Sequence, residues 1–133
     1  MVMQFAEEAE YRDVVLDTLD FLKTQVDFAV AKGICQEKII IDPGIGFAKG
    51  TEDNLQILNR LDEFKKIGVP LLVGTSRKAT IGQVLDLPVD DRIEGTAATV
   101  AVAITRGADM VRVHDVKEMC RVSKMTDAIV RRG

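Results

Sequence analysis

Three segments of the chain end in residues that could bind a small polar ligand. Residues 39–47 read IIIDPGIGF, in which β-branched residues lead into Asp42 and a Pro-Gly pair turns the chain. Residues 69–78 (VPLLVGTSRK) end in hydroxyls and two cations, and residues 110–115 (MVRVHD) end in a cation, an imidazole and a carboxylate. In α/β proteins with parallel strands, ligands bind beyond the carboxyl ends of the strands. These three ends are therefore the expected functional site.

The period-two alternation of a strand indicates which side chains share a face. In the last segment it places Arg112 and His114 on the face of Met110. In the first segment it places Asp42 with Ile40. A carboxylate and two potential cations at one sheet edge are costly to desolvate unless they meet partners or a ligand.

Each of these residues also has an ordinary structural interpretation. Asp42 precedes Pro-Gly and could serve only the turn, His114 could be a structural histidine, and Arg112 could pair with an aspartate, either Asp115 or Asp42. The glycine loop matches neither common nucleotide motif, because Lys49 stands where GxGxxG needs its third glycine and no P-loop spacing follows.

Segments with helical periodicity separate the strand-like runs, which predicts a repeated strand, loop and helix around a parallel sheet. Acidic residues at Glu7, Glu8 and Glu10 suit a first helical turn, Thr51 is the expected N-cap of a second helix that ends near Gly68, and two further helices are expected at 94–106 and 116–132. The apolar residues expected to face the core are Val15, Leu19, Leu22, Val26 and Val30; Leu55, Leu58, Leu61 and Phe64; Ile81, Val84 and Leu85; and Met119, Val122, Met125 and Ile129.

Composition limits the class of protein. The chain has 133 residues, 47% hydrophobic, with a formal charge of −3 and few aromatics, which predicts one domain over residues 1–133 and no nucleic-acid surface. There is no apolar run of about 18 residues, so no membrane association is expected. Cys35 and Cys120 are isolated, which favours buried thiols in a reduced, cytoplasmic protein.

Motifs in four places resemble one enzyme family. DPGIGF at 42–47, GTSRK at 74–78 followed by Ile81-Gly82, Asp91-Arg92 with Gly95-Thr96, and RVHDV at 112–116 are similar to the carboxyl-terminal half of dihydropteroate synthase. The resemblance implies a partial TIM (βα)8 barrel, comprising roughly strands five or six to eight with their helices. It also implies condensation of 6-hydroxymethyl-7,8-dihydropterin diphosphate with 4-aminobenzoate, which gives 7,8-dihydropteroate for folate biosynthesis.

The resemblance implies a role for each matching residue. Asp42 would accept the two adjacent N–H donors of the pterin, and Lys78 would donate to its carbonyl and ring nitrogen. Arg112 would lie over the pterin plane and, with His114, bind the diphosphate leaving group, while Phe47 would pack beside the aminobenzoate ring. The full set implied for substrate binding is Asp42, Phe47, Gly74, Ser76, Lys78, Arg112 and His114, of which Lys78, Arg112 and His114 would be catalytic.

The chain also departs from the family pattern. Ala79 stands where a serine usually helps to hold the aminobenzoate carboxylate, which leaves backbone N–H groups and Thr80. The opening MVMQ resembles a remnant of the fifth strand. A full barrel needs about 200 to 250 residues, so about half is expected to be absent, including the asparagine that helps to hold Mg²⁺. Mg²⁺ is therefore an expected cofactor without its protein ligand.

Three hypotheses follow. The chain is a synthase fragment that retains the pterin and diphosphate half-site and has little turnover alone, or a half-enzyme completed by another chain, or a non-catalytic pterin-binding or assembly module. In each case the open sheet and the helices after strands six to eight, through which the family dimerises, predict a homodimer.

Overall fold

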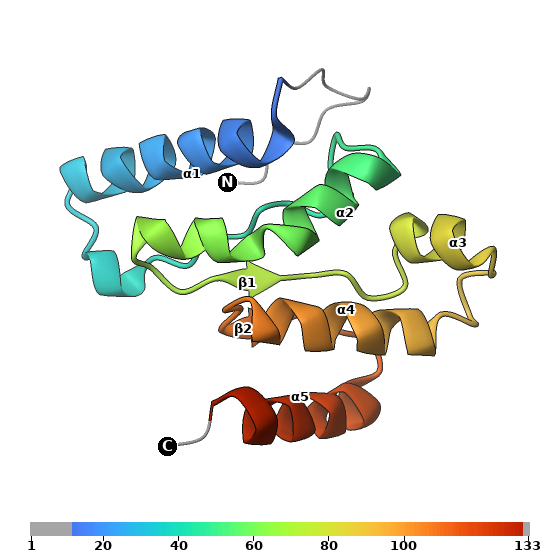
Figure 1. Ribbon diagram of the computed structural model, residues 1–133. Helices are drawn as coiled ribbons and strands as arrows, with labels where there is room; N and C mark the ends of the chain where they lie inside the picture. The colour runs from blue at the N-terminus through green and yellow to red at the C-terminus, as the bar shows by residue number, and fades with distance from the viewer. Residues whose placement is uncertain (1–11, 132–133) are drawn as a thin grey trace.

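The computed structural model describes residues 12–131, in which helices alternate with short extended segments (Figure 1). The elements in chain order are α1 (Val14–Ala31), the 3₁₀ helix η1 (Gln36–Lys38), α2 (Thr51–Asn59), the 3₁₀ helix η2 (Leu61–Ile67), β1 (Leu72–Val73), α3 (Ala79–Leu85), α4 (Ile93–Thr105), β2 (Met110–Val111) and α5 (Val116–Val130). The residues predicted for a fifth-strand remnant, the acidic residues 7–10 and the expected helix end at 132 lie outside the described part.

The sheet is parallel, as predicted, but shorter than the apolar runs indicated. β1 pairs with β2 in the register Leu72 with Met110 and Val73 with Val111. The first segment forms only a parallel bridge, in which Ile41 lies opposite the residue before β1. The predicted apolar runs therefore form only short strands. Within the described residues, regular pairing between β1 and β2 stops after two positions, and the chain then enters the polar loops.

The two faces of the sheet differ as the alternation predicted. Ile41 and Val73 are buried beneath the helices, at 3% and 2% exposed. Ile40 and Met110 lie on the opposite face and are 48% and 45% exposed. The helices therefore cover one face of the sheet, and the other face is open within the described residues.

The core lies between the sheet and the helices, which follow one another in space in chain order (Figure 1). Phe64, Leu61, Ile57 and Leu71 are fully buried in the larger cluster. A second cluster, centred on Met119, joins α4 to α5. Several residues expected in the core are instead exposed: Val30, Leu55, Val84, Leu85, Met125 and Ile129. The apolar stripes are wider than the surface that neighbouring elements cover.

Three local predictions were wrong. The second predicted helix begins at Thr51 with Gly50 as its N-cap, and Asp53 accepts the Gly50 N–H at 3.4 Å. It also changes to a 3₁₀ helix after Asn59, so it is two helices rather than one. Cys35 is the residue before η1, Cys120 lies on α5, and both thiols are exposed rather than buried. No helix within residues 12–131 is long and apolar enough to cross a bilayer.

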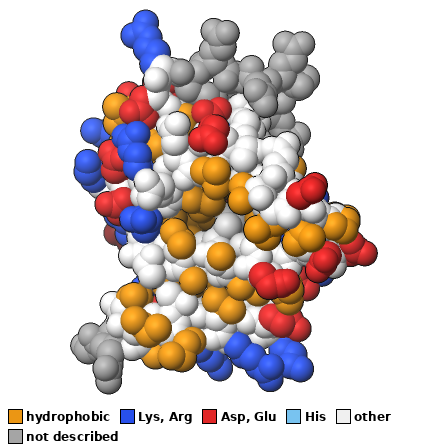
Figure 2. All heavy atoms as spheres, turned by 45° about the vertical axis from the view of Figure 1, so that its right-hand side comes forward, with side chains coloured by type: hydrophobic (Ala, Val, Ile, Leu, Met, Phe, Trp, Pro, Cys, Tyr) orange, Lys and Arg blue, Asp and Glu red, His pale blue; other side chains and the backbone are white. Residues whose placement is uncertain are grey.

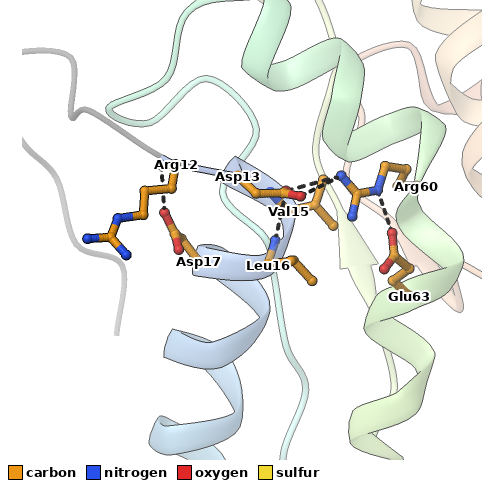
Figure 3. A network of polar contacts seen from close by, with 7 residues as sticks. All are labelled: Arg12, Asp13, Val15, Leu16, Asp17, Arg60 and Glu63. Carbon is orange, nitrogen blue, oxygen red and sulfur yellow. Dashed lines mark hydrogen bonds and ion pairs between the residues drawn. The ribbon is translucent and has the colours of Figure 1, made fainter.

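Hydrogen bonds and an ion pair of Asp13 connect the start of α1 to the end of α2 (Figure 3). Its carboxylate accepts the N–H groups of Val15 and Leu16 at 3.0 and 3.2 Å. Arg60 donates to both carboxylate oxygens at 3.1 Å and also pairs with Glu63 at 2.5 Å. The Leu16 N–H, followed by the Arg60 guanidinium, holds the pKa of Asp13 below its ordinary value, although burial opposes the shift.

We expect Asp13→Ala to lower the thermal unfolding midpoint, and Asp13→Asn to lower it less, because asparagine keeps the capping oxygen and loses only the charge. The folded-state pKa of Asp13 lies below 3.8, so its contribution is complete above that pH and is lost as the pH falls through the lowered pKa. Circular dichroism melts between pH 7 and pH 2 measure both effects. Asp20→Ala, at an exposed position of the same helix, is the control; equal losses in both alanine variants at pH 7 would contradict the assignment.

Candidate functional site

An ion pair between Asp42 and Arg112 joins the first and last extended segments. Arg112 Nη2 lies 3.3 Å from one Asp42 oxygen, and the Gly44 N–H donates to the other at 2.8 Å. Gly74 makes this possible, since a Cβ there would lie 2.7 Å from Arg112 Nη2. The Arg112 guanidinium therefore lies against Gly74, directly after β1, and the side chain is 57% exposed.

Lys78 lies beside this pair. Its Nζ donates to the Ile45 carbonyl at 2.5 Å and lies 5.0 Å from the centre of the Phe47 ring. Burial is the main cause that lowers the pKa of Lys78, while the charge of Asp42 opposes the shift and that of Arg112 adds to it. A half-buried ammonium held against an aromatic face can donate to a ligand carbonyl with little rearrangement.

A cavity of about 240 Å³ opens between the 44–50 loop and the start of α3. Phe47 and Lys78 form one part of its lining, and Ala79 and Thr80 form another. An aromatic ring, an ammonium and a hydroxyl therefore line the same cavity. This arrangement fits a flat, partly polar molecule.

Asn54 is a structural residue of this site that sequence reasoning missed. It is 2% exposed, its Oδ1 accepts the Gly46 N–H at 2.9 Å, and its Nδ2 donates to Thr80 Oγ1 at 2.9 Å. The amide therefore ties the loop that carries Phe47 to the helix that follows Lys78. The available signal was its spacing, since Asn54 shares the buried stripe of Leu58.

The 75–78 loop is bonded to the end of the last segment. Ser76 Oγ lies 2.8 Å from His114 Nδ1 and accepts the His114 backbone N–H at 3.0 Å. Arg77 pairs with Asp115 through two contacts, at 2.8 and 3.3 Å, and this guanidinium holds the pKa of Asp115 below its ordinary value. Of the two partners considered for Arg112, the structure therefore has Asp42.

All seven predicted site residues lie in these three loops or directly beside them. Asp42, Gly74 and Arg112 are in one group, and Phe47 and Lys78 in the next. Ser76 and His114 contact each other in the adjoining loops. No group of three or more His, Cys, Asp or Glu side chains within residues 12–131 could hold a metal ion.

The chain is similar to proteins of a known family. The family described as pterin binding enzyme matches residues 1–114. The dihydropteroate synthase of Bacillus subtilis is 48% identical over the whole chain, which covers 47% of that protein, and the dihydropteroate synthase of Clostridium beijerinckii is 49% identical over 98% of the chain and 49% of that protein. The chain thus spans about half the length of these relatives.

Solved structures give the same result. A dihydropteroate synthase from Clostridium difficile, crystallised in the presence of pteroic acid, superposes with a TM-score of 0.92 at 43% identity over 97% of this chain and 49% of that chain. A Yersinia pestis enzyme with a pterine-sulfa conjugate superposes with a TM-score of 0.92 at 35% identity over 98% of this chain and 51% of that chain. The α/β fold with a parallel sheet therefore corresponds to about half of each solved chain.

We expect Asn54→Ala to lower the free energy of unfolding by roughly 1–3 kcal/mol, the cost of leaving buried polar partners unsatisfied. Gln56→Ala removes a side-chain amide at an exposed position of the same helix and should cost less than about 0.5 kcal/mol. Urea unfolding of both variants at one pH compares them directly. Equal losses would mean that the Asn54 amide does not bind the 44–50 loop to α3.

Proposed function

Because the chain belongs to the pterin-binding enzyme family, we propose that it forms the pterin and diphosphate part of a dihydropteroate synthase active site. In that reaction the amine of 4-aminobenzoate forms a C–N bond with the pterin methylene carbon, the C–O bond to the diphosphate breaks, and the amine loses a proton. The observation that carries the proposal is the Asp42–Arg112 pair beside Lys78, at the edge where strand ends meet.

Asp42 and Arg112 bind the pterin from two directions. One oxygen of Asp42 is already oriented by the Gly44 N–H, and the carboxylate accepts the adjacent N–H donors of the pterin edge. The guanidinium of Arg112 is planar and exposed, so it stacks on the pterin face in a way that a lysine could not. In the free protein each charge partly neutralises the other.

Lys78 and Phe47 bind the remaining groups. The Lys78 ammonium donates to the pterin carbonyl and ring nitrogen, and Phe47 forms a wall of the cavity in which the aminobenzoate ring lies. Ala79 contributes no hydroxyl to the aminobenzoate carboxylate. Aminobenzoate is therefore held less strongly here than in relatives that have serine at this position.

Arg112 and His114 stabilise the negative charge that develops on the departing diphosphate, so the reaction needs no protein nucleophile. The described residues do not fit a resident Mg²⁺, because no acidic or histidine cluster surrounds a common point and Asp42 already has two partners. The cytoplasmic location and the single domain over residues 1–133 stay predictions.

The described residues form only part of a barrel, and the assignment to strands five or six to eight rests on family resemblance. The exposed inner-face residues Ile40 and Met110 favour a site that is completed by further barrel strands, in this chain or another. A non-catalytic pterin-binding or assembly module is the alternative function. Pterin binding without turnover would support that alternative.

A homodimer is supported by apolar surface on α3, on the turn that follows it and on α5. Figure 2, which brings α3 forward, shows hydrophobic side chains gathered across this face. Val84 and Val89 are 56% and 60% exposed, and Ile129 on α5 is 64% exposed. A surface of this kind is typical of an association site, and the occupant that we propose is a second copy of the chain.

Asp42→Ala should weaken binding of a dihydropterin by roughly 1.5–3 kcal/mol, the usual range for a hydrogen bond to a charged group. Calorimetry on the two proteins measures the difference. Asp91→Ala, an exposed aspartate outside the site, should leave the affinity unchanged. Equal dihydropterin affinity in wild type and Asp42→Ala would remove Asp42 from the site.

For the dimer, light scattering across a dilution series should give a mass that falls toward the monomer as concentration falls. Val89→Glu and Ile129→Glu should shift this transition to higher concentration, because a charge is costly in an apolar interface. Val30→Glu on α1 is the matched control. A wild-type chain that stays monomeric at high concentration would overturn the proposal.

A further inference from the structure

We propose that Ser76 is a positioning residue that keeps the proton of the neutral His114 ring on Nε2, the nitrogen left to face a ligand. The contact between Ser76 and His114 does not depend on which ligand binds. That the ligand is a diphosphate rests on the function proposed above.

Two contacts between the same residues determine the tautomer. Ser76 Oγ accepts the backbone N–H of His114 at 3.0 Å and lies 2.8 Å from Nδ1 of the same residue. Since a hydroxyl has one proton to donate, and its oxygen already accepts the backbone N–H, the favourable arrangement donates that proton to Nδ1. Nδ1 is then the acceptor, so the neutral ring carries its proton on Nε2.

The opposite tautomer leaves a buried proton without a partner. If Nδ1–H donated to Ser76 Oγ, the hydroxyl proton would need another acceptor, and no other contact to this hydroxyl is present among residues 12–131. Ser76 is only 5% exposed, so water does not readily replace that acceptor. An unsatisfied buried donor costs about 1–3 kcal/mol.

The serine and imidazole are kept together because the loop around them is bonded on several sides. Arg77, which follows the serine, has a φ of 58°, a conformation that a non-glycine residue seldom adopts. Its side chain pairs with Asp115 at 2.8 Å, its N–H donates to Thr96 Oγ1 at 3.2 Å, and its carbonyl accepts from Arg92 at 2.8 Å. These bonds hold the loop in the one conformation that directs the hydroxyl at the ring.

The tautomer decides whether the exposed ring nitrogen of His114 offers a ligand a hydrogen-bond donor or an acceptor. His114 is exposed, and with Nδ1 occupied by Ser76 it offers an N–H donor at Nε2. That donor is complementary to an anionic oxygen, and it acts beside the guanidinium of Arg112. The other tautomer would offer a lone pair, which repels an anion.

The chain has a single histidine, so a long-range ¹H–¹⁵N correlation spectrum of the labelled full chain reports its ring without ambiguity. We would record it at about pH 9, where an ordinary imidazole is neutral. The wild type should show an unprotonated Nδ1 and a protonated Nε2. In Ser76→Ala the two nitrogen shifts should move toward each other as both tautomers become populated.

Two control variants test whether the effect is specific to the Ser76 hydroxyl. Ser76→Thr keeps the hydroxyl and should retain the wild-type shifts, and Ser123→Ala removes a hydroxyl from α5 and should also change nothing. A wild-type ring protonated on Nδ1, or nitrogen shifts in Ser76→Ala identical to those of the wild type, would overturn the proposal. The wild-type spectrum alone is sufficient for the first of these tests, even if a variant does not fold.

Titration with inorganic diphosphate separates this proposal from the proposed function. A shift of the Nε2 resonance on addition of diphosphate, weaker in Ser76→Ala, supports both. If the tautomer is as stated and diphosphate leaves the ring unperturbed, the positioning role of Ser76 stands and the diphosphate assignment fails.

Discussion

The bonds between the 75–78 loop and the end of the last segment are the constraint on which the site depends. β1 and β2 pair over only two residues each, which is too short a ladder to align the loops that follow. Ser76 with His114, and Arg77 with Asp115, continue the alignment beyond the sheet. Because Lys78 directly follows Arg77, its ammonium is held near Arg112 and Asp42 at the ends of the neighbouring segments.

The charge balance of the site explains what it can bind. The chain has a net charge of −3, yet the cations Lys49, Lys78 and Arg112 all lie near the Asp42 carboxylate. Burial is the main cause that lowers the pKa of both lysines. A bound anion would relieve the mutual repulsion of these cations, while the carboxylate would remain available for N–H donors. The site is therefore suited to a ligand that has an N–H edge at one end and negative charge at the other.

The fold is supported almost entirely from one side. Phe64, Leu61 and Ile57 bury the helix-covered face of the sheet completely. The other face, with Ile40 and Met110, gains no such cover from residues 12–131. The elements that orient the three loops all pack on the covered side, and over these residues the fold superposes on a solved dihydropteroate synthase with a TM-score of 0.92.

The sequence by itself determined most of the helices and the parallel order of the segments, and it located the three loops that follow the strand-like runs, because periodicity, glycine turns and strand ends are local properties of the chain. Only the tertiary structure decided which charges pair. Arg112 and Asp42 are separated by 70 positions, and Arg77 and Asp115 by 38, so their contacts depend on how the loops close. It also decided which stripes are covered, as the exposed Ile129 illustrates. An apolar stripe in the sequence indicates that a helix has a face that can be buried. Whether that face is buried depends on a neighbouring element, which the stripe itself does not specify.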